Sequence, residues 1–232
     1  MKQQPAPLPQ GQEKADAVRS MFDAIAPRYD LVNRIMTFRL DVRWRKRAVR
    51  ELRLSVGSRV ADLAAGTGDL CRDLVDGGLV PIGVDVSAGM LRHARTAAPL
   101  VQADVLRLPV ARASLDGATC GFALRNLVDL EVFFVELARA VRPGGRIALL
   151  EVAEPENAVL RRGHAVYFGR VVPLIGGLLS NQAAYQYLPR SVAYLPPTPE
   201  LLATLERPGF TSVERRLLTG GIAQLITATR RT

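Results

Sequence analysis

A glycine-rich turn is the first feature of the sequence that could do chemistry. Residues 62–69 (DLAAGTGD) follow a short apolar run and precede a helical pattern. The turn contains Gly66, Thr67 and Gly68. Glycine lets the backbone turn tightly and approach a ligand, whose polar groups then meet free N–H groups at the start of the helix. A dinucleotide-binding fingerprint needs another glycine where this chain has Cys71, so that fingerprint fails.

Two further carboxylates close the next two apolar runs. Asp85 and Val86 end one run, and Asp104 and Val105 follow the other. The first carboxylate can accept hydrogen bonds from both hydroxyls of a ribose, and the second, with the following N–H, can bind the edge of an adenine. Carboxyl ends of parallel strands share one edge of a sheet, so Asp62 is expected beside both. Helix capping is the alternative role of each acid, and the ordered set favours a nucleoside pocket.

The elements that must position these residues alternate regularly. Strands are predicted at 58–63, 80–86, 100–103, 115–122 and 146–152, and helices at 69–76, 88–97 and 130–141. Such alternation is typical of a doubly wound α/β fold with a mostly parallel sheet. Residues 211–217 and 222–228 predict an antiparallel C-terminal hairpin, which follows a helix at 198–205 with Thr198 as its N-cap.

The remaining segments flank this core. The N-terminal residues are rich in Pro and Gln, and the next stretch is helical with a break at Pro27. Residues 155–200 interrupt the alternation and are too long for a simple connection, which predicts a helical lid. We expect one domain over 15–232. The expected division is a flexible tail, a helical extension, a cofactor-binding core, a substrate lid and a final helix with hairpin, at residues 1–14, 15–54, 58–152, 155–200 and 201–232.

The composition excludes several classes of protein. Hydrophobic residues make up 48% and charged residues 23% of the 232, a globular balance. The net charge is +9, but only three of the 31 basic residues are lysine, so the excess could reflect genome composition as well as a partner. Cys71 and Cys120 are far apart, which argues against a disulfide scaffold and a cysteine-bound metal, and no metal is expected. No signal peptide and no membrane-spanning run is expected.

The ordered loop and acids resemble the class I methyltransferases that use S-adenosylmethionine. Residues 141–151 (VRPGGRIALLE) are similar to a helix–Pro-Gly-Gly–strand segment of the same family. The resemblance implies a seven-stranded, Rossmann-like sheet whose glycine loop holds the amino-acid part of S-adenosylmethionine. The cofactor contacts that it implies are Asp62, Gly66, Thr67, Gly68, Asp85, Val86, Asp104 and Val105.

Further stretches resemble the C-methyltransferases of menaquinone and ubiquinone biosynthesis. They are 29–33 with 41–45, 122–126 with Asp129, 139–145 with Glu151, and 185–191 with 218–221. The resemblance implies transfer of a methyl group to a ring carbon of a prenylated demethylquinol, most closely demethylmenaquinol, with a polyprenyl benzoquinol as the alternative. One departure is Asp41, which stands where the family usually has a histidine. If that histidine has a chemical role, this chain must perform it differently.

The implied reaction needs a stabilised quinolate and an aligned ring carbon. Arg125 is the expected oxyanion partner, because a fixed guanidinium lowers the pKa of the quinol and stays protonated itself. Its alternative is a structural ion pair with a residue such as Asp129. Asn126 is expected to orient the hydroxyl, and Asp30 to act as a base through water. The residues expected to line the substrate cavity are Tyr29, Tyr185 and Arg190.

The prenyl tail of such a substrate lies in a bilayer. A cytoplasmic enzyme that touches the inner face of the membrane without spanning it is therefore expected. Residues 165–179 are apolar enough to dip into the interface, and the basic excess would attract anionic headgroups. No nucleic-acid partner is expected, and a homodimer is left open. An RNA methyltransferase and a non-catalytic partner subunit are the alternatives from other classes.

Overall fold

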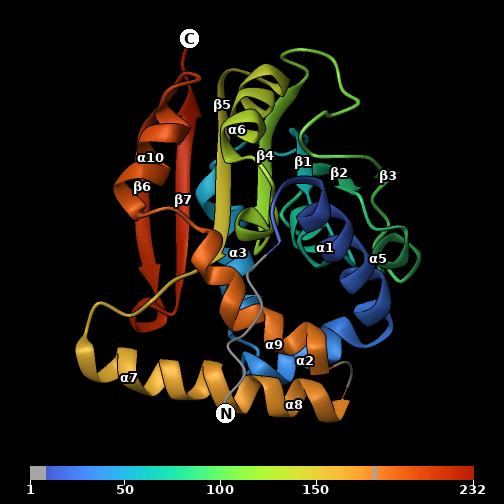
Figure 1. Ribbon diagram of the computed structural model, residues 1–232. Coiled ribbons are helices and arrows are strands. Elements are labelled where there is room, and N and C mark those ends of the chain that lie inside the picture. Colours follow the sequence, from blue (N-terminus) through green and yellow to red (C-terminus); the bar gives the residue numbers. More distant parts are fainter. Residues whose placement is uncertain (1–8, 180–181) are drawn as a thin grey trace.

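The computed structural model describes residues 9–179 and 182–232. A seven-stranded sheet in the order β3-β2-β1-β4-β5-β7-β6 forms its centre (Figure 1). The strands are β1 Arg59–Leu63, β2 Val80–Asp85, β3 Leu100–Gln102, β4 Leu115–Gly121, β5 Val141–Val152, β6 Phe210–Leu218 and β7 Ala223–Arg230. β1 to β5 pair in parallel, and β7 pairs antiparallel with β5 and β6. The predicted doubly wound sheet with its antiparallel hairpin is confirmed.

Helices pack on both faces of the sheet and bury its central strands. Those of the core are α3 Leu40–Leu52, α4 Asp69–Asp76, α5 Ala88–Arg92, α6 Leu130–Ala140 and α10 Thr198–Glu206. Phe133 and Phe134 of α6 pack with Leu201 of α10 on one face. Trp44 of α3 and Leu74 of α4 belong to the cluster on the other face. Burial of each such side chain contributes about 1.5–3 kcal/mol, so the sheet edge is a rigid platform.

The N-terminal extension folds as helices across the carboxyl edge of the sheet. It contains α1 Gly11–Ile25, the short turn η1 Ala26–Arg28 and α2 Tyr29–Met36, before α3. Pro27 lies in η1, at the predicted break. α1 begins four residues before the predicted boundary, and residues 1–8 of the expected tail lie outside the described residues. Lys14 is buried, and its ammonium donates to the Leu127 carbonyl (2.6 Å) and lies 3.7 Å from the centre of the Tyr194 ring.

The region expected to form a lid is helical. Its elements are α7 Ala158–Val166, the π-helical turn η3 Tyr167–Val171, α8 Val172–Leu179, α9 Gln182–Ser191 and the 3-10 turn η4 Val192–Tyr194. They lie beneath the sheet, with α8 against α2 (Figure 1). Within residues 9–179 and 182–232, no helix has the length and apolar character needed to cross a bilayer.

The helix predicted over 88–97 is shorter than expected. After α5 the chain turns toward the glycine loop, where the Arg95 N–H donates to the Thr67 carbonyl (3.0 Å). The Thr96 side chain fills the space over Gly68. Contacts with the loop therefore replace the hydrogen bonds that would continue the helix, and the apolar spacing in the sequence does not reveal them.

Strand β5 is longer than predicted, because it begins before the Pro-Gly-Gly segment. Val141 pairs with Leu115, and the register then shifts before Gly117. A Cβ atom at Gly117 would lie 2.5 Å from the carbonyl oxygen of Arg146 and 2.8 Å from Leu54. This close approach of two backbones explains the glycine in an otherwise buried strand.

We predict that Gly117→Ala destabilises the fold by about 1–3 kcal/mol, because the backbone of β5 cannot move away from a new methyl group. Denaturant unfolding measures the change. Gly163→Ala is the control: Gly163 is helical and has no neighbour within 4 Å of its Cβ position. There alanine is expected to be neutral or to add up to about 1 kcal/mol of stability. Equal losses in the two variants would contradict the steric explanation.

Candidate functional site

The glycine loop between β1 and α4 forms one wall of the site. Gly66 and Gly68 have φ angles of 56° and 80°, a region that favours glycine. A Cβ at Gly68 would lie 2.7 Å from the Thr96 side chain, whereas nothing lies within 4 Å of the Cβ position of Gly66. Gly68 is therefore required for packing. Gly66 offers bare backbone that a ligand can approach.

Asp85 holds this loop against the end of β2. One carboxylate oxygen accepts from the Gly66 N–H (2.8 Å), and the other accepts from the Ser87 N–H (2.8 Å). Burial raises the pKa of Asp85, and these two donors partly offset the rise. The carboxylate thus lies fixed beside the cavity with lone pairs left for a ligand.

A small cavity of about 140 Å³ lies at this edge. The structure brings Asp85, Val86, Asp104 and Val105 together around it, at the ends of β2 and β3 as expected. Asp104 is exposed, and one of its oxygens accepts from the Leu106 N–H (2.9 Å). The other oxygen of Asp104 is not part of that turn.

Asp62 lies beneath the loop. It is fully buried and accepts hydrogen bonds from the Thr119 hydroxyl (2.9 Å) and the Cys71 thiol (3.4 Å). Burial raises the pKa of Asp62 to about 7. Asp62 and Thr67 border a second, larger cavity instead of the small one.

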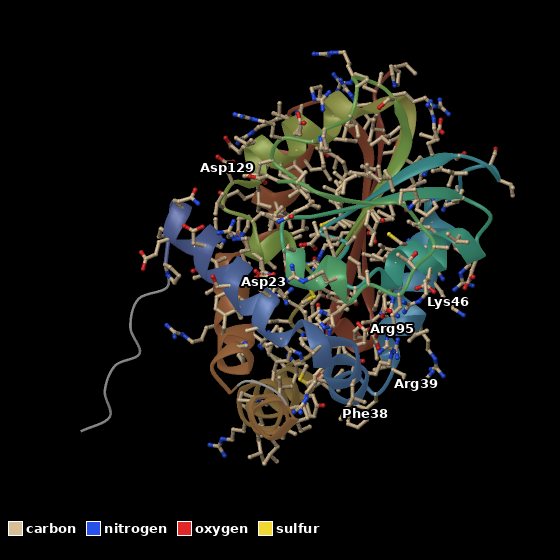
Figure 2. All side chains as sticks on the ribbon, turned by 90° about the vertical axis from the view of Figure 1, so that its right-hand side faces the viewer. Asp23, Phe38, Arg39, Lys46, Arg95 and Asp129 are labelled. Carbon is tan, nitrogen blue, oxygen red and sulfur yellow. The ribbon has the colours of Figure 1, made fainter. Side chains whose placement is uncertain are left out.

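Helix α1 covers the small cavity and is held in place by Asp23, which sequence reasoning missed. The Asp23 carboxylate accepts from the Ser87 hydroxyl (2.6 Å) and the Gly89 N–H (2.7 Å) at the start of α5 (Figure 2). A Cβ at Gly89 would lie 2.7 Å from the same carboxylate oxygen. Phe22, next to Asp23, borders the cavity. The glycine at position 89 was the available signal, since it permits close approach of another segment.

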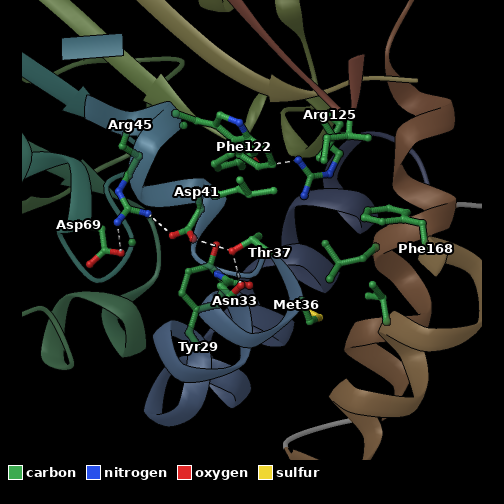
Figure 3. Close-up of a pocket in the computed structure, with 18 of the residues that line it drawn as sticks. Tyr29, Asn33, Met36, Thr37, Asp41, Arg45, Asp69, Phe122, Arg125 and Phe168 are labelled. Carbon is green, nitrogen blue, oxygen red and sulfur yellow. Dashed lines mark hydrogen bonds and ion pairs between the residues drawn. The ribbon is translucent and has the colours of Figure 1, made fainter. Parts of the chain in front are cut away.

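The larger cavity has a volume of about 500 Å³ and lies between the sheet edge, the N-terminal helices and the lid (Figure 3). Its lining is mainly apolar and includes Met36, Phe168 and Leu188. The residues that border both cavities include Tyr29, Gly66, Phe122 and Asn126. A ligand in one cavity would therefore face a ligand in the other across a shared wall.

Arg125 is buried beside the larger cavity, in the turn η2 Leu124–Asn126, and forms an ion pair with the fully buried Glu151. Glu151 also accepts from the backbone N–H of Arg125 (3.2 Å) and of Val152 (2.8 Å). Arg125 Nη1 further donates to the Phe122 carbonyl (2.8 Å). The alternative partner, Asp129, instead accepts from the Val132 N–H (2.9 Å) and caps α6. Glu151 lies at the end of β5. The stretch 139–145 with Glu151 resembles a family signature, but the sequence predicted no role for this acid.

Lid helix α9 contacts both predicted catalytic residues of η2. Arg125 Nε donates to the Ser191 hydroxyl (3.1 Å), and the Tyr187 hydroxyl donates to Asn126 Oδ1 (3.3 Å). Burial raises the pKa of Tyr187 to about 12, so its hydroxyl stays protonated at neutral pH. Arg125 Nη2 makes no hydrogen bond with another described residue, and the side chain borders the larger cavity.

The other predicted residues lie in different places. Tyr29 borders both cavities, and burial raises its pKa. Asp30 accepts from the Thr67 hydroxyl and is not among the described residues that border either cavity. The structure therefore does not bring Asp30 together with Arg125. Arg190 is exposed at the end of α9, and the side chain of Tyr185 lies outside the described residues.

Asp41, which departs from the family signature, is held by a buried network. One oxygen accepts from the Thr37 hydroxyl (2.6 Å), and the other forms an ion pair with Arg45 (2.5 Å). Arg45 also contacts Asp69 (2.9 Å) and Asp73 (3.1 Å) of α4 (Figure 3). This network joins α3 to α4, and Asp41 also borders the larger cavity. In the described part of the chain, no cluster of His, Cys, Asp or Glu could hold a metal ion.

Comparison with known sequences identifies close relatives. The model of the ubiE/COQ5 methyltransferase family matches residues 10–230. A protein of Syntrophotalea carbinolica named ubiquinone/menaquinone biosynthesis C-methyltransferase UbiE is 42% identical, over 91% of this chain and 93% of its own length. The demethylmenaquinone methyltransferase of Thermus thermophilus is 41% identical, over 88% of this chain and 97% of its own.

Solved structures share the fold at lower identity. A SAM-dependent methyltransferase from Thermotoga maritima matches with a TM-score of 0.64 and 18% identity, over 92% of this chain and 99% of that one. Phosphoethanolamine N-methyltransferase 2 of Haemonchus contortus, in complex with S-adenosyl-L-methionine, matches with a TM-score of 0.56 and 15% identity, over 77% of this chain and 50% of that one. These similarities support a class I methyltransferase fold.

We predict that Glu151→Gln destabilises the protein by about 3–5 kcal/mol, because it leaves the Arg125 guanidinium buried without its counter-charge. Chemical unfolding at neutral pH measures the change. Glu131→Gln is the matched control, since Glu131 pairs with Arg207 on the surface (2.6 Å) and both side chains are mostly exposed. That exposed pair is expected to contribute less than about 1 kcal/mol. Similar losses in both variants would show that the Arg125 pair is not a buried interaction.

Proposed function

The chain belongs to the ubiE/COQ5 methyltransferase family, and from this we propose that it transfers the methyl group of S-adenosylmethionine to a ring carbon of a prenylated demethylquinol. Demethylmenaquinol is the proposed substrate, in agreement with the names of several relatives. A polyprenyl benzoquinol is the alternative. The observation that carries the proposal is a buried guanidinium, Arg125, that borders the large apolar cavity next to Asn126, which borders both cavities.

The small cavity suits S-adenosylmethionine. The open space over Gly66 would admit a ligand to the backbone of the loop. The fixed carboxylate of Asp85 would accept hydrogen bonds from ribose hydroxyls, and Asp104 with the Val105 N–H would bind the adenine. Held by these residues, the cofactor would supply an electrophilic methyl group.

Arg125 would stabilise the nucleophile. A neutral quinol carbon attacks weakly, and ionisation of the adjacent hydroxyl makes the carbon electron-rich. An anion in an apolar cavity is strongly disfavoured unless a fixed positive group faces it. Glu151 holds Nη1 of Arg125, which would leave Nη2 for the quinolate oxygen, and Asn126 would orient the same oxygen.

The proton of the quinol must go to another acceptor. The guanidinium of Arg125 stays protonated in proteins and cannot take it. Asp30 lies outside both cavities and accepts from Thr67, and Asp41, which borders the larger cavity, is ion-paired with Arg45. We therefore assign Asp30 to positioning the glycine loop and propose that a solvent water accepts the hydroxyl proton. After the transfer, the hydrogen on the methylated ring carbon must also leave as a proton. Return of a proton to the ring oxygen then restores the aromatic quinol, so one proton in all goes to solvent.

The decisive assay offers labelled S-adenosylmethionine with a demethylnaphthoquinol, a demethylbenzoquinol of equal tail length, or tRNA. We expect label in the quinols, with the naphthoquinol preferred, and none in tRNA. Arg125→Lys is expected to lower kcat about 10²–10³-fold, as for loss of an oxyanion-stabilising donor. Asp85→Asn, by contrast, should raise the KM for the cofactor and leave kcat nearly unchanged. Labelled tRNA with unlabelled quinols would overturn the proposal.

We also propose that the protein acts at the cytoplasmic face of a membrane as a peripheral protein. Exposed apolar side chains occur on α2, on the α2–α3 turn, on α7 and on α8, and α8 packs against α2 (Figure 1). We call this the docking face: Leu31, Ile35, Phe38, Val166, Leu174 and Leu178. An exposed apolar patch of this kind favours contact with a lipid or protein surface.

Phe38 is the most unusual member of the docking face. Its side chain is 74% exposed although it has a φ of 51°, a conformation that bulky residues rarely adopt. Its ring lies 5.9 Å from that of Tyr167, and both border the larger cavity. Arg39, Lys46 and Arg95 lie nearby on the same edge (Figure 2). Phe38 would thus enter the apolar layer at the cavity mouth while these cations meet anionic headgroups.

Phe38→Asp is expected to weaken binding to vesicles containing anionic lipid about tenfold or more, because one buried aromatic side chain is lost from the interface. Co-sedimentation at low and high salt measures the effect. The matched control is Val56→Asp, an exposed apolar residue (83%) in the α3–β1 loop. Equal loss in both variants, or no vesicle binding by the unmodified protein, would contradict the docking face. A homodimer is not part of the proposal.

A further inference from the structure

We infer that the prenyl tail of the substrate switches on catalysis: by filling the larger cavity it holds lid helix α9 closed, and α9 in turn holds Arg125 and Asn126 in their working positions. The inference rests on the proposed function and names what regulates the same site. It assigns Ser191 and Tyr187 as positioning residues.

The core of the fold fixes only part of the Arg125 guanidinium. Glu151 and the Phe122 carbonyl both accept hydrogen bonds from Nη1. They therefore restrain only the Nη1 side of the guanidinium. The hydroxyl of Ser191 binds Nε and restrains the other side of the guanidinium (3.1 Å). Asn126 is oriented in the same way by the Tyr187 hydroxyl (3.3 Å). The polar part of the site is therefore complete only with α9 in place.

The lid packs on the N-terminal helices through one apolar cluster, in which Val172 of α8 and Ala184 of α9 are buried, and its outer part adds little to this packing. Helix α7 buries none of its residues, and several apolar side chains of α7 and α8 face outward. What lies between the lid and the sheet edge is the cavity of about 500 Å³. An apolar occupant of this cavity would add contacts between the lid and the sheet edge, since each buried methylene strengthens association about fourfold. An isoprenoid chain is such an occupant.

A short path connects that occupant to the guanidinium. Leu188 borders the cavity, one turn before the end of α9. Its carbonyl accepts from the Ser191 hydroxyl (2.8 Å), and the same hydroxyl accepts from Arg125 Nε. Contact between the tail and Leu188 therefore fixes the turn of helix that carries Ser191. Binding of a remote, unreactive part of the substrate is converted in this way into organisation of the reacting part.

The test compares demethylnaphthoquinols without a tail and with increasing numbers of isoprene units. For the unmodified protein we expect kcat, and not only 1/KM, to rise with tail length. In Ser191→Ala, kcat with the long tail should fall about tenfold, as for loss of one hydrogen bond to a charged group, and approach the value for the tailless substrate. The KM should still improve with tail length. Tyr187→Phe should give the same pattern with a smaller change.

The pH dependence separates positioning from a merely structural effect. A displaced guanidinium stabilises the quinolate less, so the pKa of the bound quinol rises. The acid limb of the kcat–pH profile should therefore move to higher pH in Ser191→Ala. Thr204→Ala is the matched control, because Thr204 is also a buried hydroxyl bonded to a helix carbonyl (2.8 Å) but lies in α10. It should leave tail dependence and pH profile unchanged.

Two results would overturn the inference: equal kcat for all tail lengths in the unmodified protein, or undiminished tail dependence in Ser191→Ala. Thermal unfolding and cofactor binding of Ser191→Ala exclude a folding defect as the cause of lost activity. Failure to methylate any quinol would instead refute the proposed function, so the two failures are distinguishable.

Discussion

The ion pair between Arg125 and Glu151 is the interaction on which the architecture of the site depends. It joins the end of β5 to the turn after β4, and through Ser191 it reaches the lid. A buried pair of this kind contributes little net stability, because desolvation offsets most of the attraction. Its effect is positional. It keeps a positive charge at the carboxyl edge of the sheet, beside an apolar cavity where a charge would otherwise not remain.

The same pairing of buried charges affects how the net charge is distributed. Arg45 and Arg125 are both buried, and they are accompanied by acids, including Asp41, Asp69 and Glu151. Those acids are used inside the molecule and do not balance the arginines on its surface. The net charge of +9 therefore understates how basic the exterior is. Arginine in this chain thus has an internal task, and the proposed membrane contact would give it a second one at the surface around Phe38.

The sequence predicted the sheet well, because the periodicity of apolar residues and the position of glycines follow directly from strand and helix geometry. The ends of β2 and β3 brought Asp85 and Asp104 to one cavity for the same reason. Pairings between distant segments were not predictable. Nothing in the local sequence of Glu151 or Ser191 indicates that both would contact one guanidinium, and the Asp23 contact to α5 depends on where α1 lies. Asp30 was predicted to be a base from its place in a family motif. The motif does not show that the Asp30 carboxylate accepts a hydrogen bond from the Thr67 hydroxyl.

Helix α1 borders both cavities, for example through Phe22, whereas helices α7 to α9 border only the large one. The small one is covered by α1, which Asp23 and Lys14 anchor at its two ends, whereas the large one is enclosed by α7 to α9. Exchange of the used cofactor would therefore need movement of α1 only. Release of the methylated product would need movement of the lid only. The proposed docking face belongs to the lid side and the α2–α3 turn. A molecule bound to a bilayer through that face could therefore exchange its cofactor with the aqueous solution while it stays bound to the lipid.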